Sequence, residues 1–244
     1  MVTTRKNGSL YTRIDGKVAH VEFGHPASNS FVSELSENEG ISVILLKSEG
    51  EKAFCAGASF DELLEVSNLE EGKAFFSGFA HVINAMRKCK KVIVGRVHGK
   101  TVGGGVGLAA ACDYVYSNVN SSIKLSELSI GIAPLVIAPA VARKIGNAAM
   151  GEMSLAPTEW KSAYWAQEKG LFNKVYDNAQ EMDKELDFFI HKSASYNPDA
   201  LTEWKKVLWE GTDHWDTLLT DRASITGKLA LSEFTRNALS KFKK

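Results

Sequence analysis

Two short turns rich in small residues have the composition expected of a site that holds a negatively charged oxygen atom. Gly103, Gly104 and Gly105 follow a predicted strand and precede an Ala-rich helix. The first N–H groups of a helix have no helical partner and lie at the positive end of its dipole. A second small-residue turn, residues 54–60, follows another strand. We expect N–H groups from both turns to converge on one oxygen and to stabilise an oxyanion.

The same glycines do not fit the common nucleotide-binding motifs. In residues 95–101 two glycines enclose three residues, whereas the phosphate-binding loop of nucleoside triphosphatases needs four. In residues 103–108 the last position of the dinucleotide-binding pattern is Leu108 instead of glycine. We therefore expect neither a nucleoside triphosphate nor a dinucleotide at this turn.

Proton transfer beside an oxyanion site needs an acid or a base, and Glu127 is the best candidate. It lies between Leu125 and Leu128 in a stretch of apolar and small residues. An apolar pocket raises the pKa of a carboxyl group and makes it an effective acid or base near neutral pH. Because a single glutamate in a loop is ordinarily a solvated surface residue, the local pattern leaves both interpretations open.

Strands and helices alternate over most of the chain and would position these residues. Asp15 and Gly16 predict a hairpin turn between the first two strands. Apolar residues at helical spacing predict a helix over residues 69–86. The apolar or alternating runs that predict strands are residues 10–14, 18–23, 42–47, 92–97, 114–116 and 175–176.

The pattern changes toward the C-terminus, where strand signals become rare. Residues 159–169 and the segment from residue 181 onward are predicted to be helical. Alternation of strand, helix and strand is typical of a largely parallel α/β core. We therefore expect an α/β core over residues 1–185 and a C-terminal α-helical module over residues 186–244.

The composition is that of an ordinary folded protein and argues against several kinds of partner. Among the 244 residues, 29 Lys and Arg balance 29 Asp and Glu, so no global positive field would attract nucleic acid or an anionic membrane. The widely spaced Cys55, Cys89 and Cys112 argue against a disulfide framework and a structural zinc site. No apolar stretch has the length of a signal peptide or a membrane span, so we expect a cytoplasmic protein.

Four segments occur in a specific order: residues 52–58 (KAFCAGA), 98–105 (HGKTVGGG), 111–113 (ACD) and 125–134 (LSELSIGIAP). In this order they resemble the enoyl-CoA hydratase/isomerase, or crotonase, superfamily. The resemblance implies a spiral of ββα turns with a C-terminal helical module that covers the active site and mediates assembly into a homotrimer or a dimer of trimers. It also implies an acyl-CoA thioester as the ligand, with the backbone N–H groups of Ala58 and Gly104 bound to its carbonyl oxygen.

By the same resemblance, Glu127 occupies the position of a catalytic glutamate. The two-carboxylate hydratases carry a further glutamate shortly after the triple glycine, where this chain has Gly107. Glycine cannot activate water, so we expect a one-base isomerisation of 3-enoyl-CoA to 2-enoyl-CoA. Hydration of 2-enoyl-CoA, including branched or glutaconyl-type thioesters, stays open because Asp61 or Glu62 could provide the second carboxylate. An acyl-CoA-binding scaffold without turnover also stays open.

The resemblance assigns further contacts to the CoA moiety. It places Ala27 near the CoA stem and Ala56 and Phe60 near the adenine, and Lys243, in the basic C-terminal run, is a candidate for the CoA phosphates of a neighbouring subunit. No metal or other cofactor is expected, because the thioester itself accepts the electron pair. The helix that the family carries before the third strand is expected to be short, since residues 31–40 leave room for one or two turns.

Overall fold

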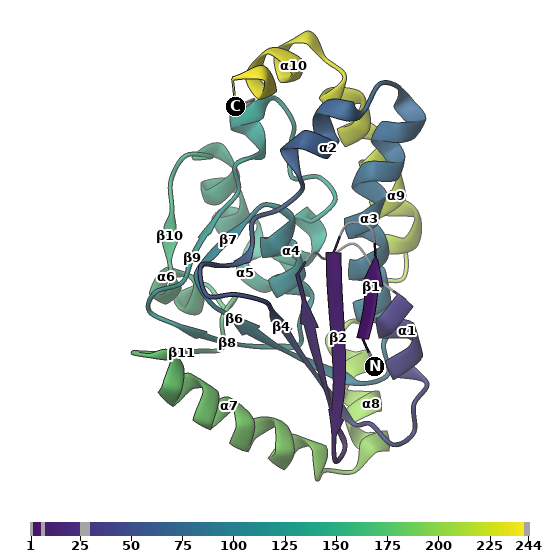
Figure 1. Ribbon diagram of the computed structural model, residues 1–244, viewed down its shortest axis with the longest axis vertical. Helices are drawn as coiled ribbons and strands as arrows, with labels where there is room; N and C mark the ends of the chain where they lie inside the picture. The colour runs from purple at the N-terminus through teal and green to yellow at the C-terminus, as the bar shows by residue number, and fades with distance from the viewer. Residues whose placement is uncertain (1, 6–7, 25–29, 242–244) are drawn as a thin grey trace.

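The computed structural model describes residues 2–5, 8–24 and 30–241 (Figure 1). Backbone angles at Gly146, φ 76° and ψ 162°, break helix α5 (Ala138–Leu155) into two parts. The elements in chain order are β1 (Val2–Arg5), β2 (Gly8–Asp15), β3 (Val18–Phe23), α1 (Ser30–Ser36), β4 (Val43–Ser48), β5 (Ala53–Cys55), α2 (Phe60–Glu65), α3 (Leu69–Lys88), β6 (Val92–Val97), β7 (Lys100–Val102), α4 (Gly104–Ala111), β8 (Tyr114–Asn118), β9 (Ser122–Lys124), the 3-10 helix η1 (Glu127–Ile130), α5 (Ala138–Leu155), β10 (Lys161–Ser162), α6 (Ala163–Glu168), β11 (Lys174–Tyr176), α7 (Ala179–Ala194), α8 (Pro198–Leu208), α9 (Trp215–Ala230) and α10 (Glu233–Ser240).

The strands form two sheets that the chain visits in turn. The larger sheet has the order β1-β2-β3-β4-β6-β8-β11, and the smaller has the order β10-β9-β7-β5. Strands from β3 to β11 in the larger sheet are parallel, as are β9, β7 and β5 in the smaller one. The pairs β4–β5, β6–β7 and β8–β9 each place one strand in each sheet before a helical segment. This repeat is the expected spiral of ββα turns.

The central strands of the larger sheet are buried on both faces, which explains the nearly continuous apolar runs of β4 and β6. Helices α3 and α4 contribute to the main core on one face. Helix α7 covers the other face along its length (Figure 1). The apolar residues of α7 recur at helical spacing and pack against the strands. Together they form a second buried apolar cluster, which consists of Val18, Val43, Leu45, Val94, Tyr116, Met182, Leu186, Ile190 and Ala194.

The C-terminal helices pack onto the core. Residue 185 lies inside α7, so the helix that covers the sheet is continuous across that position. Helix α9 lies along α3 (Figure 1), and the two backbones approach at Gly72 and Gly227. A Cβ atom added to Gly227 would lie 2.6 Å from the carbonyl carbon of Gly72. Glycine at both positions therefore permits the close crossing.

Several sequence predictions agree with these elements and others need correction. The hairpin forms between β2 and β3, and the short helix expected near residues 31–40 is the seven-residue α1. The helix expected over residues 159–169 begins later, because residues 161–162 pair with β9 and Ser162 caps α6 by accepting from Trp165 N. Within the described residues, no helix has both the length and the apolar character needed to cross a membrane.

We expect Gly227→Ala to lower the free energy of unfolding by about 1–3 kcal/mol, because the added methyl group forces α9 away from α3. Urea denaturation of the purified variant measures this. Gly78→Ala in α3 is the control: nothing lies within 4 Å of its Cβ position, so the better helix former is expected to stabilise by up to ~1 kcal/mol. Equal effects of the two substitutions would contradict the close crossing.

Candidate active site

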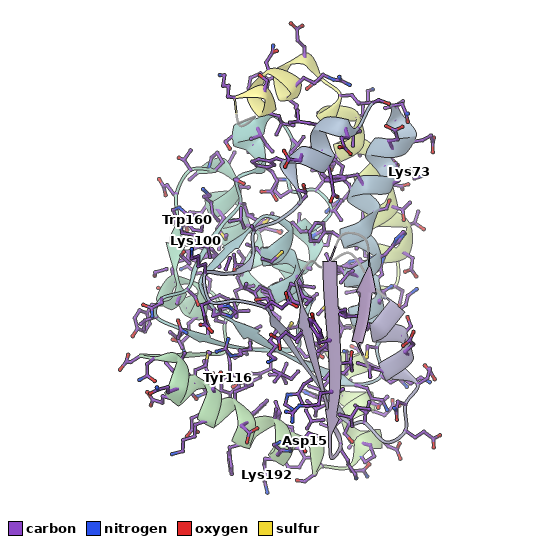
Figure 2. All side chains as sticks on the ribbon, viewed as in Figure 1. Asp15, Lys73, Lys100, Tyr116, Trp160 and Lys192 are labelled. Atoms are coloured by element: carbon purple, nitrogen blue, oxygen red, sulfur yellow. The ribbon has the colours of Figure 1, made fainter. Side chains whose placement is uncertain are left out.

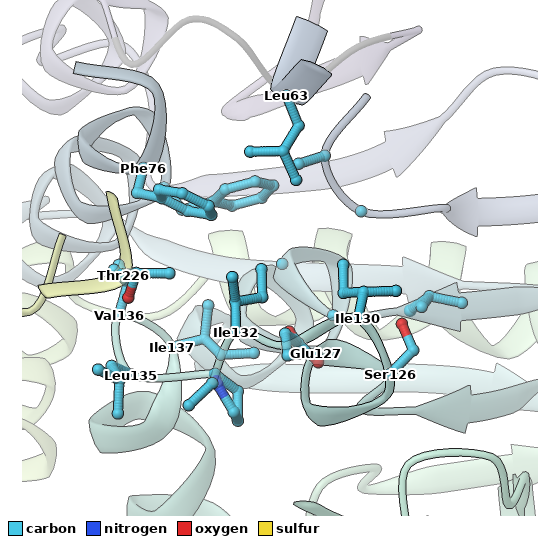
Figure 3. A pocket seen from close by; sticks show the side chains of 18 of the residues that line it. Leu63, Phe76, Ser126, Glu127, Ile130, Ile132, Leu135, Val136, Ile137 and Thr226 are labelled. Carbon is cyan, nitrogen blue, oxygen red and sulfur yellow. The ribbon is translucent and has the colours of Figure 1, made fainter. Parts of the chain in front are cut away.

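A largely apolar cavity of about 90 Å³ lies at the carboxyl ends of β5 and β7. At these ends the chain turns into α2 and α4. Figure 3 shows Glu127 on one wall, with Leu63 and Phe76 on the opposite wall. The lining residues are Ala56, Gly57, Ala58, Phe60, Leu63, Phe76, Phe79, Val102, Gly103, Gly104, Ser126, Glu127, Ile130, Ile132, Ala133, Pro134, Leu135, Val136, Ile137 and Thr226.

The two small-residue turns meet at this cavity. Parallel pairing of β5 with β7 brings them together, and a Cβ atom on Gly57 would lie 3.9 Å from the Gly104 nitrogen. Gly104 is the first residue of α4, so its N–H has no acceptor within the helix. Neither Gly104 N–H nor Ala58 N–H donates to any acceptor within residues 2–5, 8–24 and 30–241. Two unpaired backbone donors therefore border one cavity.

Close contacts explain why this turn is made of glycine. A Cβ atom on Gly104 would lie 2.2 Å from the ring of Phe79. Gly103 has φ +54°, and a Cβ atom there would lie 2.9 Å from Glu127 Oε1. The glycines thus allow an aromatic ring and a carboxylate to lie directly against the backbone.

Glu127 is held at the start of η1. Its backbone carbonyl accepts a hydrogen bond from Ile132 N at 3.2 Å, and Gly131 follows in the left-handed conformation with φ +85°. Its side-chain Oε2 is buried and has no hydrogen-bond partner among the described residues. Burial raises the pKa of Glu127 to about 7, although a hydrogen bond from its own backbone acts in the opposite direction. The carboxyl group can therefore gain or lose a proton near neutral pH.

No second carboxylate lines the cavity within the described part of the chain. At the position where a hydratase would carry its further glutamate, a Cβ atom on Gly107 would lie 2.4 Å from Ile137 Cγ2. Ile137 is itself buried and occupies the space into which such a side chain would project. Asp61 and Glu62 lie on α2 but are not among the lining residues.

The structure brings together most of the residues singled out in the sequence. Ala56, Ala58, Phe60, Gly104 and Glu127 all line the cavity. The predicted CoA contacts of Ala27 and Lys243 lie outside the described residues.

Sequence reasoning missed the apolar wall that other elements contribute. Phe76 and Phe79 come from α3, and Thr226 comes from α9. The helical spacing of residues 69–86 predicts an apolar face on α3, but it does not show that part of this face lines a cavity.

Comparison with known proteins agrees with the fold. The sequence profile of the family described as Enoyl-CoA hydratase/isomerase matches residues 15–229. The chain belongs to the enoyl-CoA hydratase/isomerase family, and it is an enzyme of that type. Its fold is that of enoyl-CoA hydratase from Bacillus halodurans, with a TM-score of 0.85 at 18% identity over 95% of this chain and 99% of that one.

Its similar relatives carry names for two different reactions. The peroxisomal Delta(3,5)-Delta(2,4)-dienoyl-CoA isomerase of Arabidopsis thaliana is 27% identical over 189 residues, which is 72% of this chain and 67% of the relative. The short-chain-enoyl-CoA hydratase of Clostridium acetobutylicum is 25% identical over 241 residues, 93% of this chain and 92% of the relative. The reaction must therefore be argued from the residues of the cavity.

We expect Glu127→Gln to stabilise the protein at alkaline pH. The raised pKa of Glu127 means that the folded state keeps a proton that the unfolded chain loses above pH 4.5, so stability falls as pH rises from 4.5 to about 7. The complete loss of folding stability over this pH range corresponds to ~3 kcal/mol. The neutral amide of the variant avoids this loss. Urea denaturation should show the variant more stable than the parent at about pH 8, with the difference shrinking at about pH 4.5. A difference that does not change with pH would contradict the raised pKa.

Proposed function

We propose that this enzyme converts a 3-enoyl-CoA thioester into the 2-enoyl-CoA isomer, with Glu127 as its acid and base. The supporting observation is that Glu127 is the one carboxylate among the described lining residues, and no group in that part of the chain donates a hydrogen bond to its Oε2. A pKa of about 7 lets the group remove a proton when ionised and return it when protonated.

The proposed reaction places the thioester carbonyl oxygen between the N–H groups of Ala58 and Gly104. Glu127 removes a proton from C2, and the electron pair spreads over the carbonyl and the C3–C4 double bond as a dienolate. The two N–H groups stabilise the charge on the oxygen, and removing one such donor typically costs ~3–4 kcal/mol of barrier. Glu127 then returns the proton to C4, and the double bond moves to C2–C3 with no net change in atoms.

Hydration of 2-enoyl-CoA is the second candidate, because the relative from Clostridium acetobutylicum is named a hydratase. In the two-carboxylate hydratases a further glutamate helps to hold and activate the water. Here Ile137 fills the space beside Gly107, and Asp61 and Glu62 are absent from the lining. These contacts favour isomerisation over hydration. The carboxylate of Glu127 argues against a scaffold without turnover, because a protein that only binds acyl-CoA would have no use for a partly buried carboxylate in the cavity.

For the rest of the thioester, the proposal assigns Ala56 and Phe60 to the CoA moiety, since both line the same cavity. Ala27 near the CoA stem and Lys243 of a neighbouring subunit stay predictions, as does assembly into a homotrimer or a dimer of trimers. The reaction needs no cofactor beyond the CoA moiety of the substrate, because the thioester carbonyl accepts the electron pair.

Mass spectrometry of products formed in heavy water tests the reaction. From 3-enoyl-CoA we expect 2-enoyl-CoA, and deuterium should accumulate at C2 and C4 over repeated turnovers because the Glu127 proton exchanges with solvent. Glu127→Gln should bind the thioester and lose about 10²–10⁴-fold in rate, since an amide of the same size cannot accept the proton. Addition of water to 2-enoyl-CoA by the parent protein would instead establish the hydratase reaction.

The pH dependence of kcat/KM for 3-enoyl-CoA should follow the ionisation of Glu127. Only the carboxylate form removes the C2 proton, so kcat/KM is expected to rise about tenfold per pH unit below the pKa and to level off above about 7. Initial rates measured from about pH 5.5 to about pH 9 give this profile. A profile that stays flat through neutral pH would rule out Glu127 as the base with this pKa.

A further inference from the structure

A second cavity, of about 300 Å³, lies at the opposite ends of the same two strands. It shares no lining residue with the candidate active site. Most of its lining residues are polar. They come from near the starts of β5 and β7, from the ends of β6 and β8, and from the first residue of α7. The lining residues are Glu51, Lys52, Arg96, His98, Gly99, Lys100, Asn118, Asn120, Ser122 and Ala179.

The N-terminus of α7 provides backbone donors to this cavity. Ala179 lines the cavity and opens a 16-residue helix. The capping side chain of Asn178 accepts from Glu181 N, and neither Ala179 N–H nor Gln180 N–H has an acceptor among the described residues. A helix N-terminus with free N–H groups attracts anions through these donors and through the helix dipole.

A buried amide on another element provides an independent donor. Asn118 is 4% exposed, and its Oδ1 accepts a hydrogen bond from Asn120 N at 3.0 Å. Asn118 lines the cavity, and its Nδ2 group donates to no acceptor within the described residues. The Nδ2 group is not sealed from the cavity, so it can donate there to a ligand or to water.

The cavity also carries more free positive than negative charge. Lys52 and Lys100 line it and form no ion pair within the described residues, whereas Glu51 is the only carboxylate of the lining. Lys100 lies beside Trp160 (Figure 2), with its Nζ 5.4 Å from the ring centroid. Lys124 Nζ lies 4.4 Å from the same centroid. Neither Trp160 nor Lys124 lines the cavity, so its free positive charge comes from Lys52 and Lys100, and an anion would be attracted to these two lysines.

The imidazole in the wall is held neutral and takes no part in binding. Burial, together with the neighbouring Arg96 charge, lowers the pKa of His98. Arg96 Nη1 donates to His98 Nδ1 at 3.0 Å, and His98 Nε2 donates to Gly50 O at 2.8 Å. Arg96 in turn forms a two-point ion pair with Asp183. Both ring nitrogens are engaged, so the donors available to a ligand are the amides and the lysines.

We propose that this second cavity binds a phosphate group, either free phosphate or the terminal phosphate of a small phosphorylated molecule. A phosphate offers several acceptor oxygens and close to two negative charges at neutral pH. These oxygens and charges match the N–H groups of α7, the Asn118 amide, Lys52 and Lys100 better than a carboxylate with two oxygens would. The volume exceeds what one phosphate ion needs, so the rest of a small molecule has room. The proposal does not depend on the isomerase reaction.

Calorimetric titration with inorganic phosphate at low ionic strength tests the site. We expect Lys100→Gln to weaken binding about tenfold, since it removes a charge-assisted contact. Asn118→Asp keeps the acceptor for Asn120 N but turns the facing donor into a negative oxygen, so it should weaken binding at least as much. Lys17→Gln, an exposed lysine in the β2–β3 turn, is the matched control and should leave the affinity unchanged.

Absence of phosphate binding to the parent protein would overturn the proposal, and so would equal affinity in Lys100→Gln and Lys17→Gln. If Asn118→Asp fails to fold, Lys52→Gln replaces it. This variant changes an exposed lysine of the lining and should also weaken phosphate binding. Glu127→Gln should bind phosphate like the parent, so failure of the isomerase reaction and failure of this site give different results.

Competition with CoA and with dephospho-CoA, which lacks the 3′-phosphate, identifies the source of the phosphate. Displacement by CoA alone assigns the site to the 3′-phosphate. Displacement by neither compound assigns it to free phosphate or another phosphorylated molecule, and displacement by both contradicts a terminal-phosphate site.

Discussion

The pairing of β5 with β7 is the constraint on which both cavities depend. These strands have three residues each, and their backbones are held close at both ends of the pair. A Cβ atom on Gly105 would lie 2.6 Å from Cys55 O, and one on Gly99 would lie 2.3 Å from Lys52 O. Side chains at these glycines would separate the strands. The separation would move the unpaired N–H groups of Ala58 and Gly104 apart at one end and would open the second cavity at the other.

The C-terminal helices are joined to the sheet by a buried polar cluster around Asp113. Its carboxylate accepts from Ile93 N and from Trp209 Nε1, each at 2.8 Å, and pairs with Lys205 Nζ at 2.9 Å. Lys205 is almost fully buried and also donates to the carbonyl of Lys91. Removing one partner would leave the other charge buried without compensation, which is strongly destabilising. Helix α8 is thus fixed to β6 and β8, in addition to the packing of α9 on α3.

The sequence predicts long apolar elements better than short ones. The runs that become β4, β6 and α3 are recognisable because burial on one or both faces repeats over six or more residues. Strands β5, β7 and β9 have three residues each, too few to establish an alternation, so the smaller sheet was not predicted. Ala58, Gly104 and Glu127 were found through motif order. Phe79 and Thr226 were not, because lining a cavity depends on how α3 and α9 pack against the turns.

The burial of Ile137 against Gly107 has a stereochemical consequence for the proposed reaction. With a single carboxylate in the described lining, the group that takes a hydrogen from C2 must also deliver one to C4. Glu127 starts a short helix at one wall of the cavity, so in the proposed reaction it acts on the acyl chain from that wall. Hydrogen therefore leaves and returns on the same face of the planar dienolate. The proposed double-bond shift is suprafacial, and a chirally labelled substrate would keep its facial identity from C2 to C4.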